Sequence, residues 1–187
     1  MKKSKIEAAE TRRRIVKTAA AEFRRKGING AGVNDVMAAA GLTHGGFYRH
    51  FDSKDELVAE ACAAAIESAE ATNQCPALGK DGLEAILADY LSADHRDNPS
   101  EGCVLAGLGS ELARSDDKTR AAATAGFLRL VDAFAQQYPG MKPQAAKARA
   151  LVAVSAMIGA ITMSRIVIDP KLSAAILRQT KKHLAAM

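Results

Sequence analysis

The sequence has few cysteines and no long uninterrupted apolar run. Its three cysteines, Cys62, Cys75 and Cys103, form neither a C-x-x-C pair nor a metal-type spacing, which favours free thiols in a reducing compartment. The longest apolar run, residues 150–164, has 15 residues between two arginines, whereas a bilayer requires about 20. The highly charged start does not resemble a secretory signal. We therefore expect a cytoplasmic protein that does not enter a membrane.

Patterns typical of catalysis are also missing. There is no Ser/His/Asp order, no paired catalytic carboxylates and no cofactor fingerprint, and Asp116-Asp117 is interpreted as the start of a helix. The four histidines lack the paired spacing of metal ligands; they are His44, His50, His95 and His183. We predict no catalytic residues, no metal and no cofactor, and we keep an enzyme as the alternative of a different class.

Basic charge is concentrated at one end of the chain. Residues 1–54 carry 12 basic and 5 acidic side chains, a net charge of +7, whereas residues 55–187 carry 14 and 16, a net charge of −2. A basic module beside a near-neutral remainder suits binding to a polyanion, and a solvated first helix is the alternative. A length of 187 residues allows one large domain or two small ones, and we expect two.

Apolar residues recur at helical spacing almost throughout, without a convincing alternating strand, so we predict an all-α fold. The N-terminal part predicts a first helix ended by Gly27 and a short second helix ended by Gly41. After a linker at residues 73–82, further helical patterns follow, including a long helix opened by Pro143 and a last one opened by Pro170.

Two more helix starts are predicted in the N-terminal part. Thr43 is expected to cap a third helix that carries Phe47 and Phe51, and Ser53 to cap a fourth, with Glu56 completing a capping box. The order of helix, glycine-containing turn and short helix is that of a helix-turn-helix, whose second helix enters the DNA major groove.

Gly45 and Gly46 are unfavourable inside a helix unless a large body approaches the backbone closely. DNA is such a body, and a nucleotide-binding loop is disfavoured because no strand precedes the glycines and no G-K-[ST] follows. In this interpretation Phe47 and Phe51 face inward. Four side chains are left to reach phosphates: Tyr48, Arg49, His50 and Lys54.

The stretch TRRRIVKTAAAEFRRKGINGAGVNDVMAAAGLTHGGFYRHFDSKDELV, residues 11–58, closely resembles the DNA-binding domain of the tetracycline-repressor (TetR/AcrR) family of bacterial transcription regulators. The likeness rests on AxxFxxxG, on AGL-T and on FYRHF-SK-EL. It implies a helix-turn-helix domain over residues 1–58, with its fourth helix continuing to about residue 72, and a C-terminal effector-binding and dimerisation domain over residues 73–187. The second part matches the family only in length and helical pattern.

The resemblance places Lys54 where a phosphate is held and Gly32 where a helix-capping threonine or serine is usual. We expect Asn34 or Asp35 to compensate for the capping oxygen that Gly32 lacks. The alternatives to a DNA contact are that His50 only covers the surface of the domain and that Tyr48 is a packing residue. The complete predicted DNA-binding set is Arg12, Arg13, Arg14, Asn34, Thr43, His44, Gly45, Gly46, Tyr48, Arg49, His50 and Lys54.

The C-terminal helices are expected to dimerise and to bind a small molecule. A stripe of small residues is the predicted dimer interface, with packing in the protomer core as the alternative; it comprises Ser155, Ala156, Gly159, Ala160 and Ser164. The candidate effector residues are Phe127, Phe134 and Met157. Cys103, at a loop-to-helix junction, is a candidate thiol sensor, with structural packing as the alternative.

We therefore predict a homodimeric, cytoplasmic regulator that binds double-stranded operator DNA and contacts no membrane. The expected activity is repression released by an unidentified small-molecule effector. Sensing of electrophiles or oxidants by Cys103 is the alternative signal. A nonspecific architectural DNA binder is disfavoured, because it would leave two thirds of the chain without a purpose.

Overall fold

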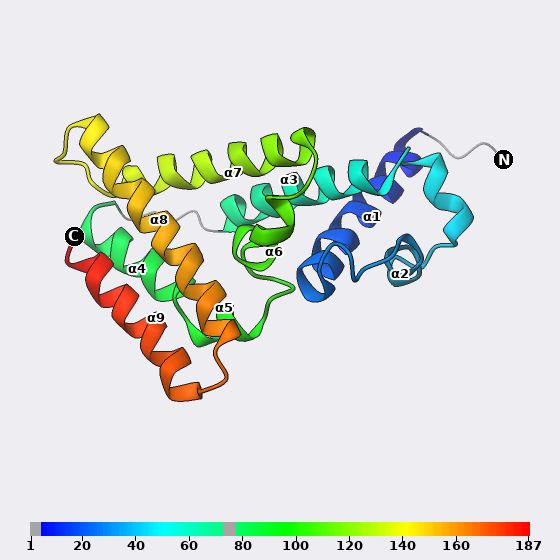
Figure 1. The fold of residues 1–187 in the computed structure, drawn as a ribbon. Helices are drawn as coiled ribbons and strands as arrows, with labels where there is room; N and C mark the ends of the chain where they lie inside the picture. The colour runs from blue at the N-terminus through cyan, green and yellow to red at the C-terminus, as the bar shows by residue number, and fades with distance from the viewer. Residues whose placement is uncertain (1–4, 73–77) are drawn as a thin grey trace.

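The computed structural model describes residues 5–72 and 78–187, without the side chains of residues 69–72, and these residues form helices and no strand (Figure 1). The all-α prediction is confirmed. Cys75 lies outside the described residues, as does the first half of the predicted linker, residues 73–77. The last three linker residues, 80–82, are helical and belong to α4.

The N-terminal domain contains α1 (Lys5–Lys26), α2 (Val33–Ala39), the 3₁₀ helix η1 (His44–Arg49) and α3 (Lys54–Thr72). Its core includes Phe23, Phe47 and Phe51, each about 1% exposed. Gly27 ends α1 with φ +81°, a conformation that costs other residues more than glycine. The predicted end of the first helix is therefore confirmed.

The C-terminal domain contains α4 (Lys80–Tyr90), α5 (Ala93–Asp97), α6 (Val104–Leu112), α7 (Asp117–Ala135), α8 (Pro143–Ile166) and α9 (Pro170–Ala185). Proline opens both α8 and α9, as expected. The Asp116 carboxylate accepts a hydrogen bond from the Thr119 N–H at 2.8 Å, so Asp116-Asp117 begins a helix, as interpreted.

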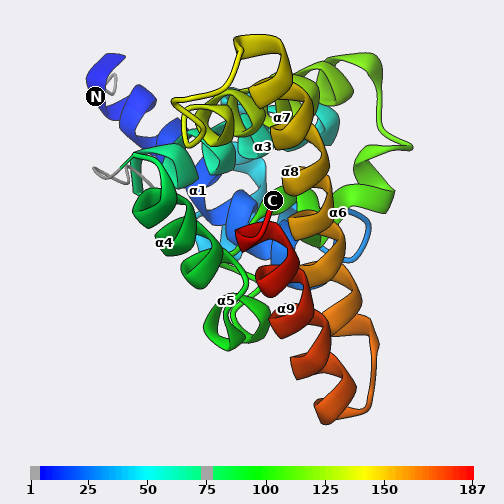
Figure 2. The same ribbon diagram turned by 90° about the vertical axis from the view of Figure 1, so that its left-hand side faces the viewer.

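α6 connects the two domains. Its residues Val104, Leu108 and Leu112 are buried in the N-terminal core, whereas Ala106 belongs to the C-terminal core. The most extensive contact between two described helices is that of α3 with α7, which also crosses between the domains. Figure 2, a view from the end opposite the helix-turn-helix, shows α4, α8 and α9 in front of the N-terminal helices.

α8 is long and apolar enough to cross a membrane by length and composition alone, with a mean hydropathy of 1.4 over 18 residues. The uninterrupted apolar run within it is shorter, because an arginine lies on either side. In the fold, one face of α8 packs against α7 and α9 and the other is exposed. Packing in the protomer core therefore explains the apolar side chains on one face of α8, but not those on its exposed face.

Candidate DNA interface and C-terminal sites

The turn between α2 and η1 is held by backbone hydrogen bonds. The Leu42 N–H donates to the Met37 carbonyl at 2.8 Å, and the Gly41 N–H donates to the Ala38 carbonyl at 2.9 Å. This pair of bonds is a Schellman motif, and it places Gly41 at φ +69°. The turn that orients the second helix of the helix-turn-helix is therefore rigid.

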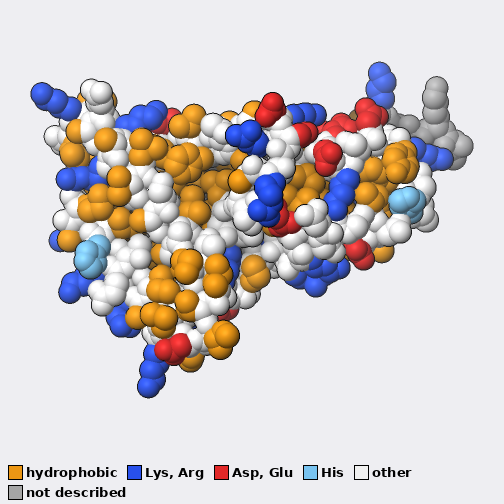
Figure 3. Space-filling view, viewed as in Figure 1, with side chains coloured by type: hydrophobic (Ala, Val, Ile, Leu, Met, Phe, Trp, Pro, Cys, Tyr) orange, Lys and Arg blue, Asp and Glu red, His pale blue; other side chains and the backbone are white. Residues whose placement is uncertain are grey.

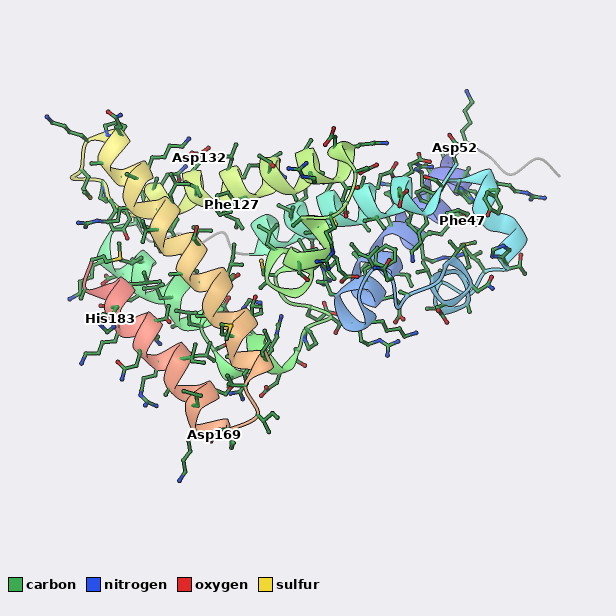
Figure 4. All side chains as sticks on the ribbon, in the orientation of Figure 1. Phe47, Asp52, Phe127, Asp132, Asp169 and His183 are labelled. Atoms are coloured by element: carbon green, nitrogen blue, oxygen red, sulfur yellow. The ribbon has the colours of Figure 1, made fainter. Side chains whose placement is uncertain are left out.

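The second helix of the motif is the six-residue 3₁₀ helix η1 rather than an α-helix. Thr43 occupies its N-cap position, but the predicted side-chain hydrogen bond of Thr43 is absent. Phe47 and Phe51 fix η1 from below, because both are buried and their rings stack with centroids 5.5 Å apart. The prediction that both phenylalanines face inward is confirmed, and Figure 4 shows Phe47 at the helix-turn-helix end of the molecule.

The two glycines of η1 face different surroundings. A β-carbon on Gly45 would have no neighbour within 4 Å, whereas one on Gly46 would lie 3.6 Å from the Met37 methyl group. Gly45 therefore leaves the outer surface of η1 without a protruding side chain, and Gly46 lies closer to the rest of the domain. Gly45 is the position at which close approach to DNA is best tested.

Around Gly45 the structure brings together Thr43, His44, Tyr48 and Arg49, all exposed. Tyr48 is 66% exposed, so it does not fill the core, and its ring contacts that of His44 at 6.0 Å. His50 is half-buried at the C-terminal end of η1. Arg13 and Arg14 on α1 and Asn34 on α2 are exposed as well, which leaves them available to phosphates.

Arg12 has internal partners. Its guanidinium pairs with Glu56 at 2.8 Å and also with Glu60, and it lies 4.1 Å from the centroid of the Phe51 ring. The Asp52 N–H and then Arg12 hold the pKa of Glu56 below its usual range. Arg12 thus fixes α1 to the start of α3, beneath η1.

Lys54 also points partly inward. Its Nζ donates to the Ile28 carbonyl at 2.5 Å and lies 5.9 Å from the centroid of the Phe23 ring. The half-buried ammonium therefore joins the start of α3 to the end of α1. Two of its three N–H donors are left for a phosphate.

The start of α3 is capped much as the sequence predicts. The Ser53 hydroxyl accepts from the Glu56 N–H at 3.1 Å, which confirms the cap. The Glu56 carboxylate accepts from the Asp52 N–H at 2.7 Å, one residue before the expected donor. At α2 the Asp35 carboxylate accepts from the Gly32 N–H at 3.0 Å, but Gly32 forms no side-chain cap, so Asp35 compensates for the missing capping oxygen only in part.

The predicted dimer stripe is partly wrong. Ala160 is 6% and Ser164 is 3% exposed within a single protomer, so both face its own interior rather than an open surface. The Ser164 carbonyl accepts a hydrogen bond from the Ser173 hydroxyl of α9 at 2.6 Å. Ala156 is half-buried, whereas Ser155 and Gly159 are exposed. The exposed face of α8 lies about one helix position away from the predicted stripe.

The face that sequence reasoning missed contains larger side chains. Val152, Met163 and Ile166 are 59%, 47% and 63% exposed, and with Ser155 and Gly159 they form one side of α8 at spacings of three and four residues. We call these five residues the α8 outer face. The α8–α9 connection adds Ile168, and Figure 3 shows hydrophobic side chains gathered over α8 and α9. The spacing of Val152, Met163 and Ile166 along the helix was the signal in the sequence that could have indicated this face.

The predicted effector residues lie in or against the C-terminal core. Phe134 and Met157 are 3% and 4% exposed, and Phe127 packs beside them from α7. Figure 4 shows Phe127 far from the helix-turn-helix. One surface groove lies elsewhere, between α4 and α9, and these residues do not line it; its lining residues are Glu84, Ala88, Arg178, Lys181, Lys182 and Ala185.

Cys103 is the N-cap residue of α6, at the predicted loop-to-helix junction. It is half-buried and packs against the C-terminal core. Cys62 is buried in the N-terminal core, and this burial raises the pKa of its thiol to about 11. Among the described residues no group of three or more His, Cys, Asp and Glu side chains is arranged to hold a metal ion.

An exposed, glycine-containing second helix on a rigid turn, set in a basic domain, defines a helix-turn-helix DNA-binding protein. Residues 15–61 match the family model of bacterial regulatory proteins, tetR family, and residues 80–183 match that of the Transcriptional regulator LmrA/YxaF-like, C-terminal domain. The chain therefore belongs to the TetR family of transcriptional regulators.

Curated relatives include an uncharacterised HTH-type transcriptional regulator of Mycobacterium tuberculosis, 30% identical over 83% of this chain and 84% of the relative. The probable acrEF/envCD operon repressor of Escherichia coli is 39% identical over 59 residues, which cover 32% of this chain and 27% of the relative. That shorter match corresponds in length to the DNA-binding domain alone.

Solved structures share the complete fold. A TetR transcriptional regulator from Chloroflexus aurantiacus is 28% identical, with a TM-score of 0.77 over 96% of this chain and 94% of that one. AibR, solved in complex with isovaleryl coenzyme A and operator DNA, is 20% identical, with a TM-score of 0.64 over 93% of this chain and 97% of that one. The likeness to AibR concerns the fold alone.

Proposed function

We propose that this TetR-family regulator is a homodimeric repressor that binds a palindromic operator through η1 and is released by a small-molecule effector. The observation that carries the proposal is the exposed surface of His44, Gly45 and Tyr48 above the buried phenylalanine pair. This surface has polar groups for base edges, with Arg13, Arg14 and Arg49 nearby in the same basic domain. Repression is favoured because a curated relative is named as an operon repressor.

Dimerisation is supported by the α8 outer face. Five residues at helical spacing expose apolar or small side chains, although monomeric proteins rarely expose a continuous apolar face of this kind. Packing two copies through α8 and α9 about a two-fold axis buries this face and leaves both copies of η1 free to contact DNA. A two-fold protein suits a palindrome whose half-sites are about 34–36 Å apart.

An effector that binds the C-terminal domain has a structural path to the DNA. The Arg24 Nε in α1 donates to the Ser100 carbonyl at 2.7 Å, and the Asn29 N–H donates to the Glu111 carboxylate in α6 at 3.2 Å. A ligand that moves α6 relative to α8 therefore moves α1 and η1. The AibR complex supports a small molecule as the signal for a regulator of this fold.

The alternative functions have less support. The relatives are transcriptional regulators rather than enzymes, and a reversible ligand is favoured over a reaction at the Cys103 thiol. We expect the protein to act in the cytoplasm, where its operator lies.

The experiment is selection of bound genomic fragments, followed by footprinting of the enriched sequence. We expect protection of a palindrome by a dimer, with contacts in successive major grooves on one side of the duplex. Binding without sequence preference, or protection of a single half-site by a monomer, would contradict the proposal. The bound sequence also indicates the regulated genes and therefore the class of compound to try as effector.

A further inference from the structure

Arg165, at the C-terminal end of α8, is a half-buried cation that forms no salt bridge among the described residues, because the nearby Asp97 carboxylate pairs with Arg96 at 2.7 Å instead. Its Nε donates to the Arg96 carbonyl at 2.9 Å and its Nη2 to the His95 carbonyl at 2.6 Å. Its Nη1 is buried and has no hydrogen-bond partner. A buried guanidinium N–H without a partner indicates a missing hydrogen-bond acceptor, and an anion would also balance the charge.

A second unpartnered donor lies in the same cluster. The Tyr90 hydroxyl is buried and has no oxygen or nitrogen partner; the Cys103 thiol is the one side chain placed to pair with it, and sulfur is a weak acceptor. Burial, followed by the influence of Cys103, raises the pKa of Tyr90 well above its usual value, so the hydroxyl is a proton donor at neutral pH. The Arg165 charge acts on the same tyrosine.

His95 holds the two donors in place. One ring nitrogen, Nε2, accepts from the Cys103 N–H at 2.9 Å, so the other, Nδ1, carries the proton and donates to the Tyr90 carbonyl at 2.7 Å. The His95 and Tyr90 rings meet edge to face at 4.6 Å. Gly102 permits this arrangement, because a β-carbon there would lie 2.8 Å from the His95 ring. The unpartnered donors are therefore preorganised rather than free to turn elsewhere.

We propose that Arg165 Nη1 and the Tyr90 hydroxyl bind the carboxylate of a small organic acid, which is the effector of the function proposed above. A carboxylate supplies both the missing negative charge and two acceptor oxygens. The hydrocarbon part of the acid lies against apolar surface, because Tyr90 and Cys103 border the C-terminal core. The inference rests on the proposed function only in naming this acid as the effector.

The site is linked to the DNA-binding domain by a short segment. Arg165 binds the carbonyl groups of His95 and Arg96, and the carbonyl group of Ser100, a few residues further on, accepts the Arg24 hydrogen bond from α1. The Cys103 N–H, at the end of this segment, donates to His95. An acid that draws Arg165 and Tyr90 together therefore displaces residues that hold α1.

The test measures binding of isovalerate and benzoate to the full-length protein without DNA, by calorimetry and thermal unfolding. Isovaleramide and benzamide are the neutral controls. We expect at least one acid to bind and to raise the unfolding temperature, and its amide to bind at least about tenfold more weakly, because a charged hydrogen bond is missing. Tyr90→Phe and Arg165→Met should each weaken acid binding by a similar factor.

Matched controls come from the same domain. Arg149→Met removes another guanidinium of α8, which lies 5.3 Å from the centroid of the Tyr138 ring, and Tyr138→Phe removes another buried, unpartnered hydroxyl. Both controls should bind the acids as wild type does. Arg165 also holds two backbone carbonyl groups, so Tyr90→Phe, which leaves those bonds intact, decides the result if Arg165→Met does not fold.

Three results would overturn the site: no binding of either acid to wild type, equal binding of acids and amides, or equal weakening in the controls and in Tyr90→Phe. Binding of an acid that leaves operator affinity unchanged would overturn its role as the effector. Failure of the protein to bind any operator would instead contradict the proposed function. Because acid binding is measured without DNA, a failure of the acid site can be distinguished from a failure of the proposed function.

Discussion

Gly126 in α7 and Ile66 in α3 lie so close together that a β-carbon on Gly126 would overlap Ile66 Cδ1 and would be 2.8 Å from Cγ2 and 2.9 Å from Cγ1. These two residues meet where α3, which leaves the DNA-binding domain, packs along α7 of the C-terminal domain. Only glycine allows the two helices to approach this closely without moving Ile66.

Gly126→Ala should therefore destabilise the protein by about 1–3 kcal/mol, the usual range for overpacking a core. Ile66→Val alone should cost about 0.5–1.5 kcal/mol. The double variant should be more stable than the sum of the two effects implies, because valine lacks Cδ1, the carbon of Ile66 nearest to the new methyl group. Urea unfolding of all four proteins measures the coupling, and strict additivity would show that the close approach does not limit the packing.

Gly45→Val should fold normally and no longer bind the operator. The new side chain has open space around it in the free protein, so the unfolding free energy should change by less than about 0.5 kcal/mol. In the complex it would stand between η1 and the groove. Gly140→Val, at an exposed glycine in the α7–α8 connection, is the control and should bind DNA as wild type does. Wild-type affinity of Gly45→Val in a gel-shift titration would contradict close approach at η1.

Arg49→Ala and Lys54→Ala should both reduce the salt dependence of DNA binding, by about 0.9 in the slope of log K against log salt for each phosphate interaction that the substitution removes. Only Lys54→Ala should also lower stability, by about 1 kcal/mol, because the Ile28 carbonyl is left without its donor. Salt titrations and urea unfolding separate the two effects. An unchanged slope for either variant would show that its side chain binds no phosphate.

Gly159→Leu and Ala160→Leu should differ although the positions are adjacent. Gly159 is exposed on the α8 outer face, with no neighbour within 4 Å of a β-carbon, so a leucine there should disrupt the dimer and leave the protomer folded. Ala160 is buried, so a leucine there should destabilise the protomer by about 1–3 kcal/mol. Sedimentation and thermal unfolding distinguish the outcomes, and a fully dimeric Gly159→Leu would place the interface elsewhere.

Acidification should destabilise the C-terminal domain through His95. Burial is the main reason why the pKa of His95 is below its usual value, and the nearby Arg165 adds to this. As the pH falls below about 6.5, the unfolded chain takes up a proton at this histidine before the folded chain does, so the unfolding free energy decreases. His95→Gln, whose amide oxygen can still accept from the Cys103 N–H, should show a smaller decrease between pH 7 and pH 5. Equal pH dependence of the two proteins would assign the effect to other groups.

Local sequence patterns indicated most of the helices and the helix-turn-helix, although not the short α5 or the 3₁₀ form of η1. Gly27 and Gly41 end their helices because the left-handed conformation is inexpensive only for glycine, and Ser53 caps α3 through a bond within one turn. These interactions involve residues close in the chain, so the sequence alone determines them. Phe47 and Phe51 likewise face inward, because their spacing along the helical segment places both on the side that packs against the core.

Interactions between distant residues were decided only by the tertiary structure. Arg12 and Lys54 have partners far along the chain, in Glu60 and Ile28, so their internal roles could not be deduced from a basic pattern. The rotation of α8 decides that Ala160 is buried and Gly159 exposed, because one helix position turns a side chain by about 100°. Tyr90, separated from Arg165 by most of the C-terminal domain in sequence, comes near it only because α4 and α8 both contribute to the C-terminal core. Composition and spacing determine what each helix buries locally, whereas the packing of helices decides which polar groups are left without partners.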